Sequence, residues 1–252
     1  MIFNSNNNFN VNFIICGTQK GGTTALDHYM RMHSEVCMAK KKEVHFFDND
    51  KYFLTNSPLY NKYHKFFNPK KNHKVIGEST PIYMFWINAM ERIFNYNPNI
   101  KLIIILRNPI ERAFSNWNME IQRKREKRTF LESIHDEMKQ LNREIKQNRT
   151  YSYLRRGFYT DQIKRILKIF KKKQLLCLKN ENLRNKPEDT LSLVSDFLDI
   201  SKFKNTQKIS IHSRNYNEKL GFEEKQLLND IFLEEIESLE KLLSWDLSTW
   251  KS

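Results

Sequence analysis

Short apolar runs alternate with longer segments of helical periodicity along this chain. The runs predict four strands, at Phe13–Cys16, Val75–Glu78, Leu102–Arg107 and Leu175–Lys179. The first, third and fourth runs are almost entirely apolar, which is typical of strands buried on both faces. Helices are predicted between and after the strands, over these ranges: Thr23–Met32, Phe85–Asn95, Ile110–Lys124, Phe130–Arg149, Phe158–Phe170, Pro187–Leu198 and Glu223–Leu243.

This order of elements predicts an α/β fold with three layers, in which helices cover both faces of a central parallel sheet. No linker rich in Gly, Ser or Pro divides the 252 residues. We therefore expect a single domain over 1–252, with 1–12 as a disordered or short N-terminal extension. Ligands of such folds bind outside the carboxyl ends of the strands, so the candidate site residues are those near these ends.

The segment Gly17–Thr24 follows the first strand and holds three of the six glycines of the chain. Glycines allow successive backbone N–H groups to point at one anion, and the start of the next helix adds a partial positive charge. Lys20 adds a full charge, and Thr23 and Thr24 add hydroxyl donors. The segment therefore predicts an anion cradle, most naturally for a phosphate, within a P-loop-like strand-loop-helix.

The spacing of this segment differs from that of the P-loop NTPases in the position of the lysine. Gly17 and Gly22 fit the pattern, but Thr23 stands where the lysine should be. A P-loop NTPase also has an acidic residue after a later strand to hold Mg²⁺. Here the run Leu102–Arg107 ends in a basic residue, and Ser115 lies in the next predicted helix. Both residues favour a second anionic group over a metal ion.

Charge and composition narrow the function classes further. Lys and Arg total 43 and Asp and Glu total 29, so the net charge of +14 favours anionic partners. No apolar run approaches the roughly 20 residues of a transmembrane helix, and the first twelve residues do not resemble a secretory signal. Cys16, Cys37 and Cys177 form neither a disulfide framework nor a metal knuckle. We therefore expect a cytoplasmic protein without a membrane partner.

Five segments, taken together, resemble the PAPS-dependent sulfotransferases. The segment Lys20-Gly21-Gly22-Thr23-Thr24 is similar to the loop of that family that binds the 5′-phosphosulfate. Leu102–Ser115 is similar to the strand-Arg…Ser segment that binds the 3′-phosphate. Three more segments resemble the heparan-sulfate-type branch of the family and occur in the same order: Lys42–Asp48, Gly77–Tyr83 and Arg156–Tyr159.

The resemblance implies transfer of a sulfuryl group from PAPS, with PAP as the product and without a metal. The acceptor would be a hydroxyl or an amine of a small molecule, such as a natural product, or of a carbohydrate. Lys20 would stabilise the leaving phosphate, while Thr24 binds it and Thr23 caps the helix, although the two threonines can exchange roles. The residues implied for nucleotide binding are the following: Lys20, Gly21, Gly22, Thr23, Thr24, Arg107, Ser115, Tyr159, Ser213 and Arg214.

The acceptor must lose its proton to a base, and two residues compete for that role. The resemblance implies Glu43, whereas His45 is the better base at neutral pH. If the segment is extended, both side chains point to the same side, so that one can orient the other.

Acceptor-binding residues are expected at the mouth of the cleft. Glu78, near the end of a strand, is predicted to face it, and Phe47 and Tyr83 are predicted to line the acceptor pocket, although such aromatic residues are more often core. The family usually has a lysine directly after this glutamate, but here the residue is Ser79. This difference favours a smaller or less acidic acceptor than a sulfated polysaccharide.

Two alternatives come from other function classes. A P-loop nucleotide kinase would share the glycine segment, but its lysine and its Mg²⁺-binding acid are absent from the expected positions. A non-catalytic nucleic-acid-binding protein would explain the charge and basic runs such as Lys171–Lys173. These runs are scattered over several predicted elements, so nucleic acid is not an expected partner.

Overall fold

A computed structural model describes residues 9–55, 57–141, 147–207 and 219–251. These residues form two compact units that alternate along the chain. Of the described residues, the first unit comprises 9–55, 57–106 and 166–207, and the second comprises 107–141, 147–165 and 219–251. Each unit is therefore built from two separate stretches of sequence.

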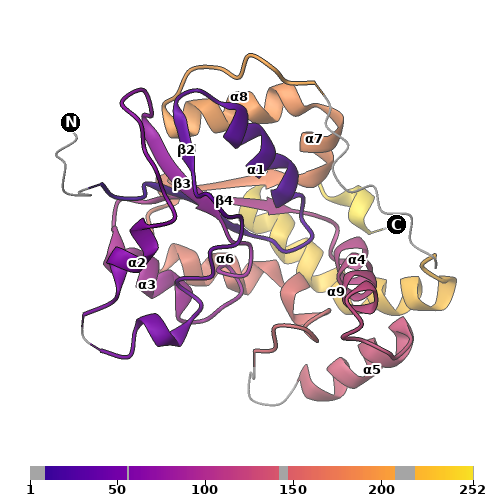
Figure 1. The fold of residues 1–252 in the computed structure, drawn as a ribbon. Coiled ribbons are helices and arrows are strands. Elements are labelled where there is room, and N and C mark those ends of the chain that lie inside the picture. Colours follow the sequence, from indigo (N-terminus) through magenta and orange to yellow (C-terminus); the bar gives the residue numbers. More distant parts are fainter. Residues whose placement is uncertain (1–8, 56, 142–146, 208–218, 252) are drawn as a thin grey trace. The chain divides into compact units, whose positions relative to one another are not determined.

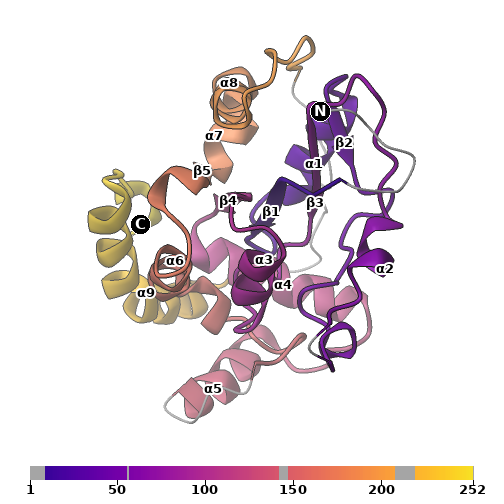
Figure 2. The ribbon, with the colours of Figure 1, turned by 90° about the vertical axis from the view of Figure 1, so that its left-hand side faces the viewer.

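The first unit contains a five-stranded sheet with the order β2-β3-β1-β4-β5, in which every neighbouring pair of strands is parallel. The strands are β1 (Phe13–Gly17), β2 (Val36–Met38), β3 (Val75–Ser79), β4 (Lys101–Leu106) and β5 (Leu175–Lys179). Figure 2 shows them in this order from one edge of the sheet to the other. Because the strands are parallel, their carboxyl ends lie at one edge, where Ile15 of β1 is paired with Ser79 of β3.

Helices cover both faces of this sheet. In Figure 1, α1 (Thr23–Met32), α7 (Asn180–Asn185) and α8 (Pro187–Leu198) lie on one side, and α2 (Tyr60–His64) and α3 (Ala89–Tyr96) lie on the other. The core under α1 includes alternate strand residues, such as Phe13 and Ile15 of β1, as the two-residue period of a strand requires. Each fully buried side chain of this size contributes about 1.5–3 kcal/mol, so the junction between β1 and α1 is firmly held.

The second unit is helical. It contains α4 (Pro109–Gln122), α5 (Phe130–Leu141), α9 (Phe222–Leu243) and most of α6 (Tyr159–Leu167). The short 3₁₀ turns of the chain are η1 (Asp50–Tyr52), η2 (Arg155–Gly157), η3 (Lys172–Gln174) and η4 (Ser248–Trp250). Asn108 caps α4 by accepting a hydrogen bond from the N–H of Ile110 (2.9 Å), and Pro109 follows as the first helical residue.

Buried charged side chains of the second unit form hydrogen bonds with its own backbone. Arg112 is fully buried and donates to the carbonyl of Tyr153. The buried carboxylate of Glu137 accepts from the N–H groups of Leu154 and Arg155, at 2.8 and 2.9 Å. Such contacts offset the cost of removing charged groups from water.

The predicted α/β fold, with a central parallel sheet and flanking helices, is confirmed. The helices Thr23–Met32 and Pro187–Leu198 agree with the prediction to the residue. The prediction missed β2, which has only three residues, and the short helices α2 and α7. A run of three residues is too short for periodicity to separate a strand from a loop.

Four predicted helices extend beyond those of the structure. The helices predicted to end at Lys124 and Phe170 end at Gln122 and Leu167, and two others differ by more residues. The helix predicted from Phe85 begins instead at Ala89, because the N–H groups of Phe85 and Trp86 both turn back to the carbonyl of Ile82. The helix predicted over Phe130–Arg149 ends at Leu141 within the described part of the chain, and residues 147–149 are not helical.

The start of the described chain is tied into the sheet. Asn12 donates its N–H to the carbonyl of Ile76 (2.9 Å), and its Oδ1 accepts from the N–H of the same residue (2.8 Å). Of the predicted N-terminal extension, residues 9–12 are therefore attached to the first unit, and residues 1–8 lie outside the described part. The single domain stays a prediction. The chain divides into two compact units, but each unit is made of two stretches that alternate along the sequence. Among the described helices, none combines the length and apolar character needed to cross a bilayer.

Candidate functional site

The glycine loop, Gly17–Thr24, connects β1 to α1 at the carboxyl edge of the sheet. The N–H of Thr18 donates to the carbonyl of Ile105 in β4 (3.0 Å), which fixes the start of the loop. The N–H of Gly21 then donates back to the carbonyl of Thr18 (2.9 Å), and Lys20 between them has a left-handed φ of 68°. The loop therefore doubles back on itself directly before the helix, as an anion cradle requires.

Glycine is required at two positions of this path. A Cβ atom on Gly21 would lie 2.3 Å from the carbonyl oxygen of Ile105. Gly22 has a φ of 103°, and a Cβ atom there would lie 2.3 Å from Nδ2 of Asn180. That same nitrogen donates to the carbonyl of Gly21 at 2.9 Å. Any side chain would push the loop away from β4 and α7, so only glycine allows this close approach.

The start of α1 suits an anionic ligand. Gly22 is the N-cap, so the prediction that Thr23 caps the helix is wrong: Thr23 is the first helical residue and is buried, while Thr24 is half-buried. The first turn contains no acidic residue, and its partial positive charge therefore has no local carboxylate to neutralise it. Together with the half-buried Lys20, this surface has the donors and charge that a phosphate-type anion needs.

The segment Lys42–Asp48, here called the Glu43 loop, brings three acid–base groups together. Nε2 of His45 lies 3.6 Å from Oε2 of Glu43, and Nδ1 of His45 lies 2.9 Å from Oδ2 of Asp48. Nζ of Lys42 also pairs with Oε1 of Glu43 at 2.9 Å. The Asp48 side chain is fully buried, whereas those of Glu43 and His45 are 39% and 41% exposed. The imidazole therefore lies between an accessible carboxylate and a buried one.

These contacts set opposite protonation states for the two candidate bases. The contact with His45, and then the charge of Lys42, lower the pKa of the Glu43 carboxyl to about 2. Hydrogen bonds with Asp48 and Glu43 raise the pKa of the His45 imidazole to about 9. At neutral pH Glu43 is therefore a carboxylate and His45 an imidazolium, so of the two only Glu43 is in the form that accepts a proton.

Glu43 and His45 meet through a left-handed backbone. Their φ angles are 59° and 55°, so the segment is not extended at these residues. The two side chains do lie together, but the left-handed backbone brings them together, and not the alternation of side chains along an extended segment. The N–H of Glu43 donates to the carbonyl of Ser79 at 2.9 Å. This bond attaches the Glu43 loop to the end of β3, next to the strand that carries the glycine loop.

The three residues predicted to bind the acceptor are fully buried: Glu78, Phe47 and Tyr83. Glu78 lies within β3, and its Oε1 accepts from the hydroxyls of Tyr63 (2.8 Å) and Tyr83 (3.2 Å). Its Oε2 accepts from the hydroxyl of Thr80 at 2.5 Å. The prediction that Glu78 faces the cleft mouth is therefore corrected, because α2 and the turn after β3 cover it.

The described part of the second unit carries three of the predicted nucleotide-binding residues. Arg107 pairs with Glu111 one helical turn further on, with Nε and Nη2 at 2.9 and 2.8 Å from the same oxygen. Tyr159 is fully buried, and its hydroxyl donates to the carbonyl of Arg107 (2.8 Å). Ser115 is buried within α4. The structure therefore brings Arg107 and Tyr159 together.

Two further predicted residues, Ser213 and Arg214, lie outside the described residues. Asp48 was not singled out as a site residue, although its spacing of three residues from His45 lies within the segment that carried the family resemblance. Tyr63 could not have been found, because only the packing of α2 on β3 brings it to Glu78. Among the described residues there is no group of three or more His, Cys, Asp or Glu side chains able to hold a metal.

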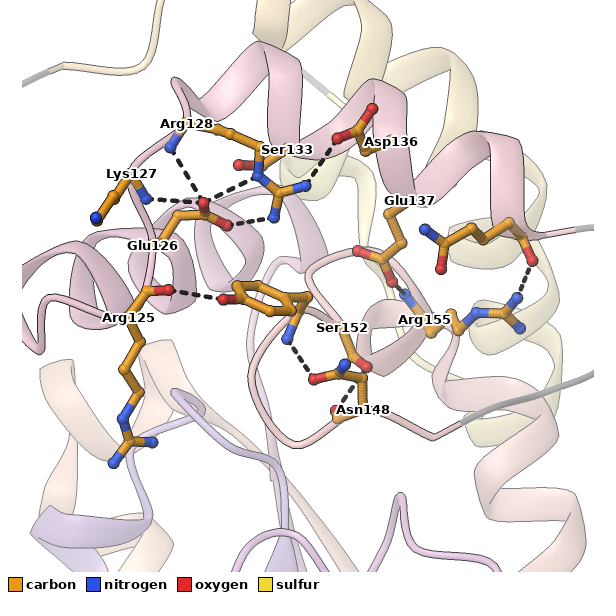
Figure 3. Close-up of a pocket in the computed structure, with 12 residues that line it drawn as sticks. Arg125, Glu126, Lys127, Arg128, Ser133, Asp136, Glu137, Asn148, Ser152 and Arg155 are labelled. Carbon is orange, nitrogen blue, oxygen red and sulfur yellow. Dashed lines mark hydrogen bonds and ion pairs between the residues drawn. The ribbon is translucent and has the colours of Figure 1, made fainter.

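A cavity of about 470 Å³ in the second unit contains none of the predicted site residues among those that line it. Figure 3 shows one of its charged side chains, Arg128, paired with two carboxylates. Arg128 lies between Glu126 and Asp136, with nitrogen–oxygen distances of 2.6 and 2.8 Å. Glu126 also accepts from two successive backbone N–H groups, those of Lys127 and Arg128. This network stabilises the turn between α4 and α5.

Comparison with known proteins identifies relatives over most of the chain. A family model for the sulfotransferase domain matches residues 11–226. The chain is 31% identical over 210 residues to heparan sulfate glucosamine 3-O-sulfotransferase 5 of Mus musculus, covering 83% of this chain and 58% of that protein. It is 39% identical over 111 residues to the membrane-associated sulfotransferase kil1 of Dictyostelium discoideum, covering 44% of this chain and 23% of that protein. It thus spans less than two thirds of either relative.

A solved structure supports the same assignment. The crystal structure of a sulfotransferase from Alicyclobacillus acidocaldarius superposes with a TM-score of 0.80 at 26% identity, covering 97% of this chain and all of that one. Such a match favours the predicted enzyme class, a transferase of the EC 2.8.2 type, over the P-loop kinase and nucleic-acid-binding alternatives. With the fold and most of its length matched, the chain belongs to the sulfotransferase domain family.

Proposed function

We propose that this protein transfers a sulfuryl group from PAPS to a hydroxyl of a carbohydrate-type acceptor. The proposal rests on one observation: two loops lie next to each other at one edge of the sheet. The glycine loop follows β1, and the Glu43 loop is bonded to the end of β3, the strand paired with β1. Sulfuryl transfer needs a group that stabilises the leaving phosphate and a base that accepts the proton of the acceptor. The glycine loop is proposed for the first role and the ionised carboxylate for the second.

Lys20 and the backbone N–H groups of the glycine loop are proposed to bind the 5′-phosphate side of PAPS. Their charge stabilises the leaving phosphate while its bond to sulfur breaks and the bond from the acceptor oxygen to sulfur forms. The hydroxyl of the half-buried Thr24 is the proposed side-chain donor to the same phosphate. Gly21 and Gly22 admit no side chain, because β4 and α7 occupy that space, and the loop backbone itself is proposed to face the ligand.

The 3′-phosphate of the nucleotide is proposed to bind to Arg107 and Ser115, with Ser213 and Arg214 assisting. Tyr159 acts on Arg107 rather than on the ligand in this proposal, because its hydroxyl is already bonded to the Arg107 carbonyl. Arg107 must exchange its partner Glu111 for the phosphate, which is a stronger acceptor for its fork of donors.

Glu43 is the proposed base, and His45 and Asp48 are proposed to position it. The buried Asp48 carboxylate holds the imidazolium, and the imidazolium faces Glu43. A carboxyl with a pKa of about 2 is a weak base, so the bound acceptor must displace the ammonium of Lys42 or exclude water from Glu43. Either change raises the pKa of Glu43 and strengthens it as a proton acceptor.

The acceptor class rests on the relatives and on one substitution. The Mus musculus relative is named for 3-O-sulfation of a heparan sulfate glucosamine, which favours a sugar hydroxyl over an amine. Ser79 replaces the lysine usual in the family, and its carbonyl is bonded to Glu43. We therefore propose an acceptor less acidic than heparan sulfate. A cytoplasmic location, and the lack of membrane and nucleic-acid partners, stay predictions.

The first test is titration calorimetry with PAP in the presence of EDTA. Lys20→Ala and Arg107→Ala are expected to weaken binding at least tenfold. Lys124→Ala is the matched control, because Lys124 has the same charge and a left-handed φ of 57° but lies outside the proposed site. Binding of ATP that requires Mg²⁺, without binding of PAP, would contradict the proposal.

The second test measures transfer of labelled sulfate from PAPS to heparan sulfate, to its desulfated form and to neutral oligosaccharides. Loss of a general base typically costs about 10²–10⁴-fold in rate, so Glu43→Gln should reduce kcat by that factor. His45→Gln should reduce kcat less. A larger loss in His45→Gln than in Glu43→Gln would assign the base to His45 instead.

A further inference from the structure

The Glu43 loop has an unfavourable backbone that something must hold in place. Glu43 and His45 both have left-handed φ angles, although neither is a glycine, an asparagine or an aspartate. Such residues persist only where the surrounding structure fixes them. The contact between Glu43 and His45 depends on this conformation, so the groups that fix it control the geometry of the proposed base.

The hydroxyl of Tyr83 is bonded to the loop directly after His45. It accepts from the N–H of Phe46 at 2.9 Å and from the N–H of Phe47 at 3.4 Å. Tyr83 is fully buried, so water does not compete for this hydroxyl. On the other side of the pair, the N–H of Glu43 is bonded to Ser79. The two left-handed residues therefore lie between two points at which the backbone is attached.

Glu78 determines which way the Tyr83 hydroxyl points. The N–H groups of Phe46 and Phe47 can only donate, so the single proton of the Tyr83 hydroxyl is directed to its remaining partner, Oε1 of Glu78 (3.2 Å). The lone pairs of the Tyr83 oxygen are then turned to the backbone N–H groups of Phe46 and Phe47. Glu78 thus orients the Tyr83 hydroxyl so that its oxygen can accept hydrogen bonds from the Glu43 loop.

We propose that Tyr83, oriented by Glu78, is a positioning residue that holds the Glu43 loop in its left-handed conformation and so keeps His45 between Glu43 and Asp48. This role replaces the acceptor contact expected for Tyr83 and Glu78, since both are buried. The inference rests on the proposed function only where it concerns catalysis. The hold on His45 itself follows from contacts within the first unit.

Tyr63 provides a matched control. It is also a fully buried tyrosine, and its hydroxyl donates to the same Oε1 of Glu78, at 2.8 Å. Within the part of the chain that the structure describes, the N–H groups of Phe46 and Phe47 donate to Tyr83 and not to the Tyr63 hydroxyl. Tyr83→Phe and Tyr63→Phe each remove one hydroxyl from Glu78 and leave a ring in the core. Only Tyr83→Phe removes the acceptor of the two loop N–H groups.

The test is an NMR titration of His45 in the full chain, with His45→Gln used to assign the signal. The charged groups that face this imidazole are Glu43 and Asp48, with Lys42 paired to Glu43. In Tyr83→Phe the pKa of His45 should fall by at least one unit, because its carboxylate partners are no longer held. In Tyr63→Phe it should stay as in the unchanged protein. An unchanged titration in Tyr83→Phe, or an equal shift in both variants, would overturn the proposal.

Kinetics separate this inference from the proposed function. Tyr83→Phe should lower kcat at least tenfold while the affinity for PAP changes less than twofold, and Tyr63→Phe should keep kcat within about threefold. If Glu43→Gln keeps full activity but Tyr83→Phe still shifts His45, the base assignment fails and the positioning role stands. Should Tyr83→Phe not fold, Glu78→Leu removes the acceptor of the Tyr83 proton, and the same direction of shift is expected for His45. Glu78→Gln is its control, because the amide oxygen still accepts from Tyr83, and it should leave the His45 titration unchanged.

Discussion

Gly21→Ala tests whether the glycine loop is as tightly fixed as its contacts indicate. The added methyl group would start 2.3 Å from the carbonyl oxygen of Ile105 and 2.7 Å from Cγ2 of Thr18. The Ile105 carbonyl belongs to a central strand and cannot move alone. The loop must therefore retreat, and the bond from the N–H of Thr18 to this carbonyl (3.0 Å) is lost or stretched.

The cost follows from these two effects. Overpacking by one methyl group costs about 1–3 kcal/mol, and one backbone hydrogen bond contributes about 0.5–1.5 kcal/mol. We expect a loss of about 2–4 kcal/mol in the free energy of unfolding, or about 5–15 °C in the melting temperature for a chain of this size. The affinity for PAP should fall at least tenfold, since the loop N–H groups no longer converge on one phosphate.

Thermal unfolding and PAP calorimetry measure both effects, with Gly221→Ala as the control. A Cβ atom on Gly221 would also be close to a neighbour, but that neighbour is the carboxylate end of Glu224, which can rotate away. The control should lose no more than about 1 kcal/mol, the cost of a poorer helix cap. If Gly21→Ala melts within 2 °C of the unchanged protein and binds PAP equally well, the loop is not fixed by Ile105 and the argument is refuted.

Three further outcomes follow from single contacts. Burial raises the pKa of Glu78 to about 7, so between pH 4.5 and 7 the native state keeps a proton that the unfolded state releases. The free energy of unfolding should therefore fall by up to about 3 kcal/mol as pH rises from 4.5 to 8. Urea unfolding at several pH values should show a weaker pH dependence for Glu78→Gln, and an equal pH dependence in both proteins would contradict this. Asp48→Asn should lower the pKa of His45 from about 9 toward its ordinary value, and NMR titration checks this shift. The variant should also lose the stability that protonated His45 contributes at pH values below about 9. Glu235→Ala should cost about 1–2 kcal/mol in thermal unfolding, because its Oε1 accepts from both N and Oγ1 of Thr160 at the start of α6, whereas Glu235→Gln keeps an acceptor and should cost less.

The glycine loop could be predicted because its determinants are local. A strand, three glycines, a lysine and a helix follow one another within about twenty residues, and each acts on its immediate neighbours. The pairing of Glu43 with His45 was also accessible, since the two residues are close in sequence. Their left-handed backbone was not, because most glutamates and histidines have a negative φ and no neighbouring residue marks these two as exceptions.

The error at Glu78 has a non-local cause. Its place in the strand was read correctly, but whether a strand end is open depends on what covers it. Here Tyr63 comes from α2, and Thr80 and Tyr83 from the turn after β3, so that three hydroxyls enclose one carboxylate. A sequence pattern shows which residues are polar, but it does not show which hydroxyls a tertiary contact will bring to them.

The interleaving of the two units has a consequence for how the protein can be made and divided. β5 pairs with β4, yet about 70 residues separate them in sequence, which adds an entropic cost to closing the sheet. During synthesis, β4 therefore stays an unprotected strand edge until β5 has left the ribosome, and such edges promote aggregation. A fragment that ends before Leu175 keeps the whole glycine loop but lacks the strand that completes its sheet. Expression trials that aim at the first unit alone should therefore join its two stretches with a linker instead of truncating the chain.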